Sequence, residues 1–320
     1  MREIIAMLRA YARAELDAWS YGLTGALLLV ALVINYSLDF ETTYISTRFL
    51  EPIQIVYYAL YYAVPFVAAI VIVARARGRG EALRDPGLWL ATLVTLVGYG
   101  VYRNFHYYGP WIQEALAPEI QRYVFICAAN LLRAALGFAL VLGFWLAVDR
   151  RLDGRAAQPL YGLSLRSIAL RPYLLMLAII SPLIAWASFQ PAFLAVYPRY
   201  TPGPELAYWG LEPWVGYAIF ELCYGTDFVF TELFFRGLLV LGFARWLGPG
   251  AVLPMVAFYA FVHFEKPLGE ALGSIFGGWV LGVIAYRTRS IAGGVVIHLG
   301  VAYLMELAAI LQRTLGAVAP

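Results

Sequence analysis

Charged residues are scarce in this chain of 320 residues: they make up 13% of it, whereas hydrophobic residues make up 62%. Soluble globular domains carry about a quarter charged residues, so this composition excludes an ordinary soluble domain. The apolar runs are about 20 residues long, which suits membrane-spanning helices and is about twice the length of a membrane barrel strand. The sequence therefore predicts an all-α, polytopic bundle of transmembrane helices.

Cysteine and histidine are also rare. The two cysteines, Cys127 and Cys223, lie in apolar runs and lack the spacing of a disulfide framework or a metal site. We expect both to be small buried hydrophobic side chains. The three histidines are His106, His263 and His298. No GxxxxGK[ST] nucleotide-binding loop occurs, and the sequence indicates no binding of nucleic acid.

Nine hydrophobic stretches are candidate spans. They are residues 21–38, 53–74, 87–102, 123–148, 172–189, 214–241, 251–264, 269–286 and 291–312. The seventh stretch is short, so we expect about eight or nine crossings of the lipid bilayer. Residues 1–19 precede the first span and are predicted to form an amphipathic helix at the membrane interface or a juxtamembrane extension, with no cleavable signal peptide apparent.

Arginines concentrate in alternate loops between these stretches. The Arg-rich loops hold Arg75, Arg77, Arg79, Arg84, Arg150, Arg151, Arg155, Arg166, Arg171, Arg245, Arg287 and Arg289. The opposite loops hold Arg48 and Arg103 beside Asp39, Glu41, Glu51, Glu114 and Glu119. Loops rich in Lys and Arg stay in the cytoplasm. We therefore expect an integral, multi-pass protein of a bacterial or archaeal cell membrane with a cytoplasmic N-terminus.

One predicted span carries ionisable side chains. Residues 217–236 are long and apolar enough to cross a bilayer, yet they include Glu221, Asp227, Glu232 and Arg236. Such groups are costly at membrane depth, usually face a protein interior or a water-filled cavity, and indicate a functional site. Because Glu232 and Arg236 are four residues apart, they share one helix face and can form an ion pair. That pair can be catalytic or purely structural.

His263 and His298 lie at a depth similar to that of Glu232. A rise of 1.5 Å per residue places all three roughly 13–20 Å from the cytoplasmic ends of their helices. One carboxylate, one guanidinium and two imidazoles from three helices can thus meet in one cavity. These groups suit a general base that activates a water molecule, and they could also hold a zinc ion. The sequence leaves the need for a metal or other cofactor unknown.

The same residues resemble three motifs of a known family. TELFFRG (231–237), the spacing from Tyr259 to His263 and the helix of His298 are similar to the patterns EExxxR, FxxxH and HxxxN/D. These patterns belong to the CPBP intramembrane proteases, which include type II CAAX prenyl endopeptidases and lysostaphin resistance protein A-like proteins. Polar groups within the predicted spans concentrate after about residue 214, so we divide the chain there into an N-terminal membrane-helical region at 1–213 and a C-terminal part. The resemblance covers 214–312 and implies a protease core there, followed by a tail at 313–320.

The resemblance also implies roles for individual residues. Glu232, His263 and His298 would take part in activating a water that attacks a peptide bond, and Arg236 would pair with a motif carboxylate. The expected substrate is a membrane-embedded or membrane-proximal peptide or protein. In the family's glutamate mechanism no metal is required.

Two positions depart from the family pattern. Thr231 replaces the first glutamate of EExxxR, and Ala302 replaces the Asn or Asp of the third motif. Asp227 lies one helical turn before Thr231, and Glu265 follows His263 by two residues, so both are candidates for a compensating carboxylate. For Asp227 a role as base and a role in balancing buried charge are equally open. For Glu265 a position in water at the end of its span is favoured.

The sequence therefore leaves three functions open. The leading one is an intramembrane endopeptidase. The second is a catalytically inactive relative that acts as a membrane scaffold, an immunity protein or a peptide-binding protein. The third is a small transporter, because carboxylates and histidines near the bilayer midplane can relay protons. The sequence shows no inverted repeat of the kind that many transporters contain.

Glycines recur in the predicted span between His263 and His298. Gly273 and Gly277, and then Gly278 and Gly282, have GxxxG spacing. Such glycines let helix backbones approach closely. The pattern predicts close packing of this helix against a neighbour.

Overall fold

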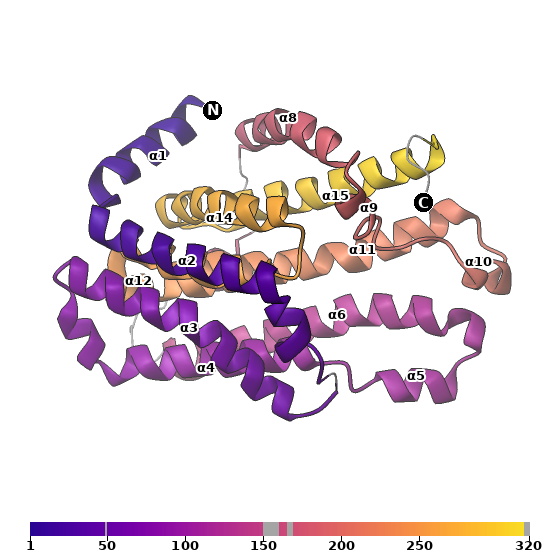
Figure 1. Cartoon of the computed structure of the whole chain (residues 1–320), viewed down its shortest axis with the longest axis horizontal. Coiled ribbons are helices and arrows are strands. Elements are labelled where there is room, and N and C mark those ends of the chain that lie inside the picture. Colours follow the sequence, from indigo (N-terminus) through magenta and orange to yellow (C-terminus); the bar gives the residue numbers. More distant parts are fainter. Residues whose placement is uncertain (49, 150–159, 165–168, 317–320) are drawn as a thin grey trace. The chain divides into compact units, whose positions relative to one another are not determined.

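The computed structural model describes residues 1–48, 50–149, 160–164 and 169–316, and all regular structure among them is helical (Figure 1). The predicted all-α fold is therefore confirmed. Four arginines of the topology argument, Arg150, Arg151, Arg155 and Arg166, lie outside the described residues.

The chain divides into two compact units that alternate along the sequence. Unit 1 comprises Met1–Asn104, Gly137–Ile168 and Thr231–Gly294. Unit 2 comprises Phe105–Leu136, Ala169–Phe230 and Val295–Pro320. The division near residue 214, predicted from the shift in composition, stays a prediction. Each unit is described by itself below.

Unit 1 is built from helices of very different lengths. Its α-helices are α1 (Arg2–Glu15), α2 (Ala18–Leu38), α3 (Ile53–Ala76), α4 (Pro86–Asn104), α12 (Ala244–Leu247), α13 (Val252–Val262) and α14 (Leu268–Thr288). Its π-helices are η1 (Glu41–Ile45), η3 (Trp145–Asp149) and η5 (Leu233–Gly242), and its 3-10 helices are η2 (Gly80–Arg84), η4 (Leu160–Gly162) and η6 (Gly248–Ala251). Helix α3 packs against α4 and α13, and α13 packs against α14.

Helix α13 forms the centre of unit 1. It is apolar on all sides, which is typical of a fully buried helix, and each residue from Val252 to Phe261 is buried. Phe258 packs against two rings of α3, with ring centroids 4.8 Å from Tyr62 and 5.5 Å from Phe66. This aromatic core fixes α13, whose C-terminal end carries His263, against the N-terminal helices.

The predicted N-terminal amphipathic helix is α1, which begins at Arg2 and ends at Glu15. Its buried residues are Ile4 and Tyr11. The hydroxyl of Tyr11 donates a hydrogen bond to the carbonyl of Pro249 at 2.6 Å, and its ring lies 5.8 Å from that of Trp279 on α14. One face of α1 is therefore bound to protein.

Unit 2 contains α5 (Gly109–Ala115), α8 (Leu170–Ala187), α9 (Pro191–Leu194), α10 (Pro204–Trp209) and most of α6 (Pro118–Phe144), α11 (Pro213–Glu232) and α15 (Ala292–Thr314). One of its cores comprises Tyr123, Cys127, Tyr200, Phe220 and Cys223. Both cysteines are free thiols and buried, as their apolar surroundings predict.

Six described helices are long and apolar enough to cross a membrane. They are Ala18–Leu38, Ile53–Ala76, Pro118–Ala147, Leu170–Ala187, Leu268–Thr288 and Ala292–Thr314. Large apolar side chains on them are exposed, such as Ile179 at 70% and Phe276 at 73%, and we expect these to face lipid. The chain is thus an integral, multi-pass membrane protein. Helix α13, with 11 residues, is too short to cross alone, and the number of crossings stays a prediction.

Candidate active site

Helix α11 becomes π-helical immediately after Glu232. The π-helix η5 runs from Leu233 to Gly242, and all of its residues are buried. Such segments are rare and often lie at functional sites. Within it, Nη1 of Arg236 lies 2.9 Å from Oε1 of Glu232, and neither side chain is exposed. The ion pair predicted from the four-residue spacing is confirmed.

Tyr259 connects this ion pair to His263. The guanidinium carbon of Arg236 lies 4.3 Å from the centroid of the Tyr259 ring, which is the geometry of a cation–π contact. The Tyr259 ring also contacts His263, one turn further along the chain, with ring centroids 4.5 Å apart. Glu232, Arg236, Tyr259 and His263 therefore form a continuous series from η5 to α13. In the sequence Tyr259 is only part of a motif spacing, and nothing there indicates its contact with the arginine.

His263 ends α13 in a conformation outside the regular helix, with φ −101° and ψ 5°. This sparsely populated backbone region is common among active-site residues. Its ring Nδ1 lies 2.9 Å from the carbonyl oxygen of Tyr259. A carbonyl oxygen can only accept a hydrogen bond, so Nδ1 carries the proton and Nε2 is the basic nitrogen of the neutral ring. This tautomer suits a general base.

Gly294, in the first turn of α15, lies against the carboxylate of Glu232. A methyl group at this position would overlap Oε2 and Cδ of Glu232. A glycine is therefore required for the close approach of backbone and carboxylate. The positive end of the helix dipole also favours a negative group beside the start of a helix. Gly294 cannot be found as a site residue from the sequence, because nothing in its local pattern indicates a contact with a residue 62 positions earlier.

Asp227 and His298 belong to unit 2. Oδ2 of Asp227 lies 3.8 Å from Nη2 of Arg133, and the two side chains are 19% and 18% exposed. The ring of His298 lies 4.7 Å from that of Phe228. An arginine beside Asp227 supports its role in balancing charge, while its role as the base stays a prediction. The meeting of His298 with Glu232 and His263 also stays a prediction.

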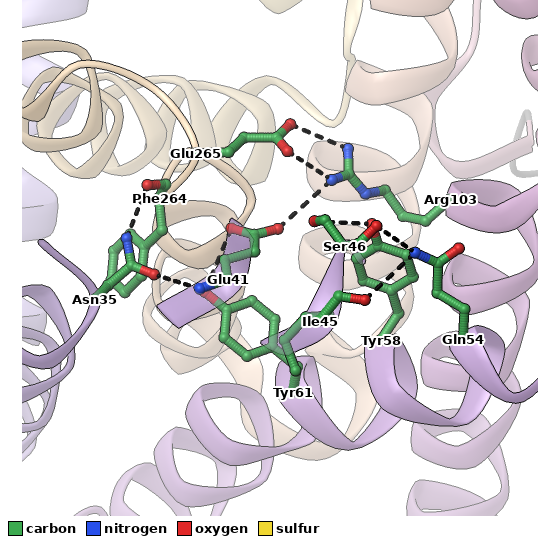
Figure 2. A network of polar contacts seen from close by, with 10 residues as sticks. All are labelled: Asn35, Glu41, Ile45, Ser46, Gln54, Tyr58, Tyr61, Arg103, Phe264 and Glu265. Atoms are coloured by element: carbon green, nitrogen blue, oxygen red, sulfur yellow. Dashed lines mark hydrogen bonds and ion pairs between the residues drawn. The ribbon is translucent and has the colours of Figure 1, made fainter. Parts of the chain in front are cut away.

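Glu265 is held by an arginine from a distant part of unit 1. Nη1 and Nη2 of Arg103 donate to its two carboxylate oxygens at 3.3 and 3.1 Å, as Figure 2 shows. The same guanidinium lies 3.5 Å from Oε1 of Glu41. The side chain of Glu265 is 34% exposed, so the expected contact with water is accompanied by an ion pair. No pattern in the sequence indicates this partner.

The carboxyl group of Glu41 is the most buried of this cluster. Its side chain is 1% exposed. Burial, followed by the charge of Glu265, raises the pKa of Glu41 to about 8, and the nearby charge of Arg103 offsets part of that rise. The residue lies between the first two candidate spans, outside both.

The two glycine pairs of α14 have different surroundings. A methyl group at Gly282 would lie 2.6 Å from Cε of Met255, and one at Gly278 would lie 3.1 Å from Cδ1 of Tyr259. No atom would lie within 4 Å of a methyl group at Gly273 or Gly277. The second pair alone thus provides the predicted close packing, and it does so against α13.

In the part of the chain that the structure describes, no group of three or more His, Cys, Asp or Glu side chains is placed to hold a metal ion. Comparisons with curated proteins and with solved structures give no match. Residues 213–304 match the family model described as type II CAAX prenyl endopeptidase Rce1-like. This range contains Glu232, Arg236, His263 and His298. The similarity to type II CAAX prenyl endopeptidases that the three motifs predict is therefore confirmed for this C-terminal region.

Proposed function

We propose that this protein is an intramembrane endopeptidase that hydrolyses a peptide bond with an activated water molecule. The observation that carries the proposal is the series from Glu232 through Arg236 and Tyr259 to His263, which lies in the part of the chain that matches the family. A fully buried carboxylate and an imidazole in one connected series are groups that can act as a general base toward water.

In the proposed reaction, Glu232 and His263 together form the general base. This base accepts one proton from water while the water oxygen attacks the carbonyl carbon of the peptide bond. The carbon–nitrogen bond then breaks, and the protonated base returns a proton to the departing amine. His298 stabilises the negative oxygen of the tetrahedral intermediate by donating a hydrogen bond. Arg236 pairs with Glu232 and orients its carboxylate.

The substrate in this proposal is a peptide or protein that lies within or next to the lipid bilayer. Both ends of the scissile bond must reach the level of the buried carboxylate. The proposed orientation places the N-terminus and the Arg-rich loops in the cytoplasm.

The test compares the termini of membrane proteins in cells that carry the wild type, Glu232→Gln, His263→Ala or a gene deletion. We expect a defined set of cleaved termini in the wild type that is absent from both variants and from the deletion, at equal protein levels. The variant Arg48→Gln is the control, because Arg48 forms an exposed pair with Glu51. Identical termini in all strains would refute peptidase activity. They would instead favour the inactive relative, for which the changes at Thr231 and Ala302 are the supporting observation.

Two further variants identify the carboxylate that acts as base. Asp227→Asn and Glu265→Gln each remove one candidate charge while preserving the size of the side chain. If Glu232 is the base, turnover is abolished in Glu232→Gln and persists in Asp227→Asn. The opposite result would assign the base to Asp227.

A further inference from the structure

Two side chains of α2 donate hydrogen bonds to the turn that follows His263. Nδ2 of Asn35 donates a hydrogen bond to the carbonyl oxygen of Phe264 at 2.8 Å. The hydroxyl of Tyr36 donates to the carbonyl oxygen of Lys266 at 2.6 Å. The backbone N–H of Lys266 in turn donates to the carbonyl of His263 at 3.0 Å. The backbone immediately after the histidine is therefore bound on both sides of Glu265.

The side chain of Glu265 forms a separate ion pair with a residue of α4. Arg103, near the end of α4, forms two parallel hydrogen bonds with the Glu265 carboxylate (Figure 2). Such a fork of charge-assisted bonds fixes both distance and direction. The guanidinium itself is oriented by Glu41 and by the ring of Tyr58, whose centroid lies 5.0 Å away.

Glu41 connects Asn35 of α2 with Arg103 of α4. Its backbone N–H donates to Oδ1 of Asn35 at 3.0 Å, which leaves Nδ2 of that amide directed at Phe264. Its carboxylate contacts Arg103 and also accepts a hydrogen bond from the hydroxyl of Tyr61 at 3.4 Å. Figure 2 shows Glu41 between the amide and the guanidinium. One cluster thus joins α2, η1 and α4 to the turn.

We propose that Arg103 and Asn35 are positioning residues that set the orientation of the His263 imidazole. The proposal rests on the proposed function, in which that imidazole is part of the base. His263 is the residue where α13 ends, so its φ and ψ are not fixed by a continuing helix. Its backbone N–H donates to the carbonyl of Ala260, and the bonds to Phe264, Glu265 and Lys266 hold the turn that follows it. Neither Arg103 nor Asn35 lies in the matched range 213–304.

The first experiment measures the histidine ring directly and needs no activity. The chain contains only three histidines, so a protein with isotope-labelled histidine in lipid nanodiscs gives few ring signals in an NMR spectrum, and single His→Ala variants assign them. We expect Arg103→Gln and Asn35→Ala to shift the His263 signals, with the signals of His106 and His298 unchanged. Arg48→Gln is the control and is expected to shift none.

The second experiment measures kcat and KM with a peptide that contains a cleavage site found by the comparison of termini. Misplacement of a catalytic group by about 1 Å can lower the rate about a hundredfold. We expect Arg103→Gln to lower kcat by about tenfold to a hundredfold with KM unchanged, and Arg103→Lys to recover part of the loss because lysine keeps the charge but not the fork. A fall in folded protein with an unchanged kcat would contradict positioning.

The two experiments separate the two proposals. Absence of turnover in the wild type refutes the proposed function, while the NMR spectrum still decides whether the cluster orients His263. An unshifted His263 signal in both Arg103→Gln and Asn35→Ala overturns the positioning role. If those variants do not fold, Tyr36→Phe removes one hydroxyl only: a shifted His263 signal then supports the proposal and an unshifted one overturns it.

Discussion

Two arginine–carboxylate sites of unit 1, Glu232–Arg236 and Glu41–Arg103–Glu265, are built in different ways. Glu232 and Arg236 are neighbours on one helix, carry equal and opposite charges, and are both fully buried. Arg103 instead lies between Glu41 and Glu265, which are 62 residues before it and 162 residues after it. The first site balances its own charge. The second, among these three side chains, is balanced only when one carboxyl group carries a proton.

The largest effect is expected from a substitution that breaks the ion pair of Glu232 and Arg236. Glu232→Ala leaves the Arg236 guanidinium buried without its counter-charge, and we expect the free energy of unfolding to fall by about 3–5 kcal/mol. Unfolding in mixed micelles measures this loss. The double variant Glu232→Leu/Arg236→Met is the control, since replacing both charges by apolar groups should recover most of the stability without restoring turnover. A single variant as stable as the wild type would show that the pair is not isolated from water.

A second variant tests the close contact of Gly294 with that pair. Gly294→Ala introduces a methyl group that overlaps the Glu232 carboxylate, and overpacking of this kind costs about 1–3 kcal/mol. Gly277→Ala is the matched control, because its methyl group meets nothing within 4 Å. It should be neutral or stabilising by up to about 1 kcal/mol. Equal stabilities of the two variants would contradict the contact.

The third prediction uses pH to distinguish the two sites. The pKa of Glu41 is raised from 4.5 to about 8, so between these values the folded state binds more protons than the unfolded state. The contribution of Glu41 to stability is therefore fully present below about pH 4.5 and decreases as the pH rises to about 8. The slope is at most about 1.4 kcal/mol per pH unit. Unfolding measured across this range should show the decrease in the wild type, and Glu41→Gln should reduce it. An identical slope in both proteins would exclude Glu41 as its source.

The smallest effect is expected for an arginine–carboxylate ion pair that is exposed to water. Arg48 and Glu51 form an ion pair with side chains 49% and 53% exposed. Exposed pairs contribute about 0–1 kcal/mol, so Arg48→Gln should leave the unfolding free energy nearly unchanged in the same assay. A loss comparable to that of Glu232→Ala would mean that burial does not explain the difference between the sites.

Sequence reasoning succeeded where the interaction is local or depends on composition. The spacing of Glu232 and Arg236 predicts their ion pair, because residues four apart share a helix face. The apolar surroundings of Cys127 and Cys223 predict their burial. The change from α-helix to π-helix after Glu232 was not predicted, since a π-helix depends on tertiary packing more than on the local residue pattern.

By itself, the sequence determined that this protein is a multi-pass α-helical membrane protein, that Glu232 pairs with Arg236, and that residues 213–304 resemble a family of peptidases. Only the tertiary structure decided which of the distant polar residues become partners. Arg103 finds Glu265, and Gly294 meets Glu232, through the packing of helices that lie far apart in the chain. Spacing along a helix fixes neighbours within a turn or two, whereas contacts across many residues depend on how the helices are placed in space.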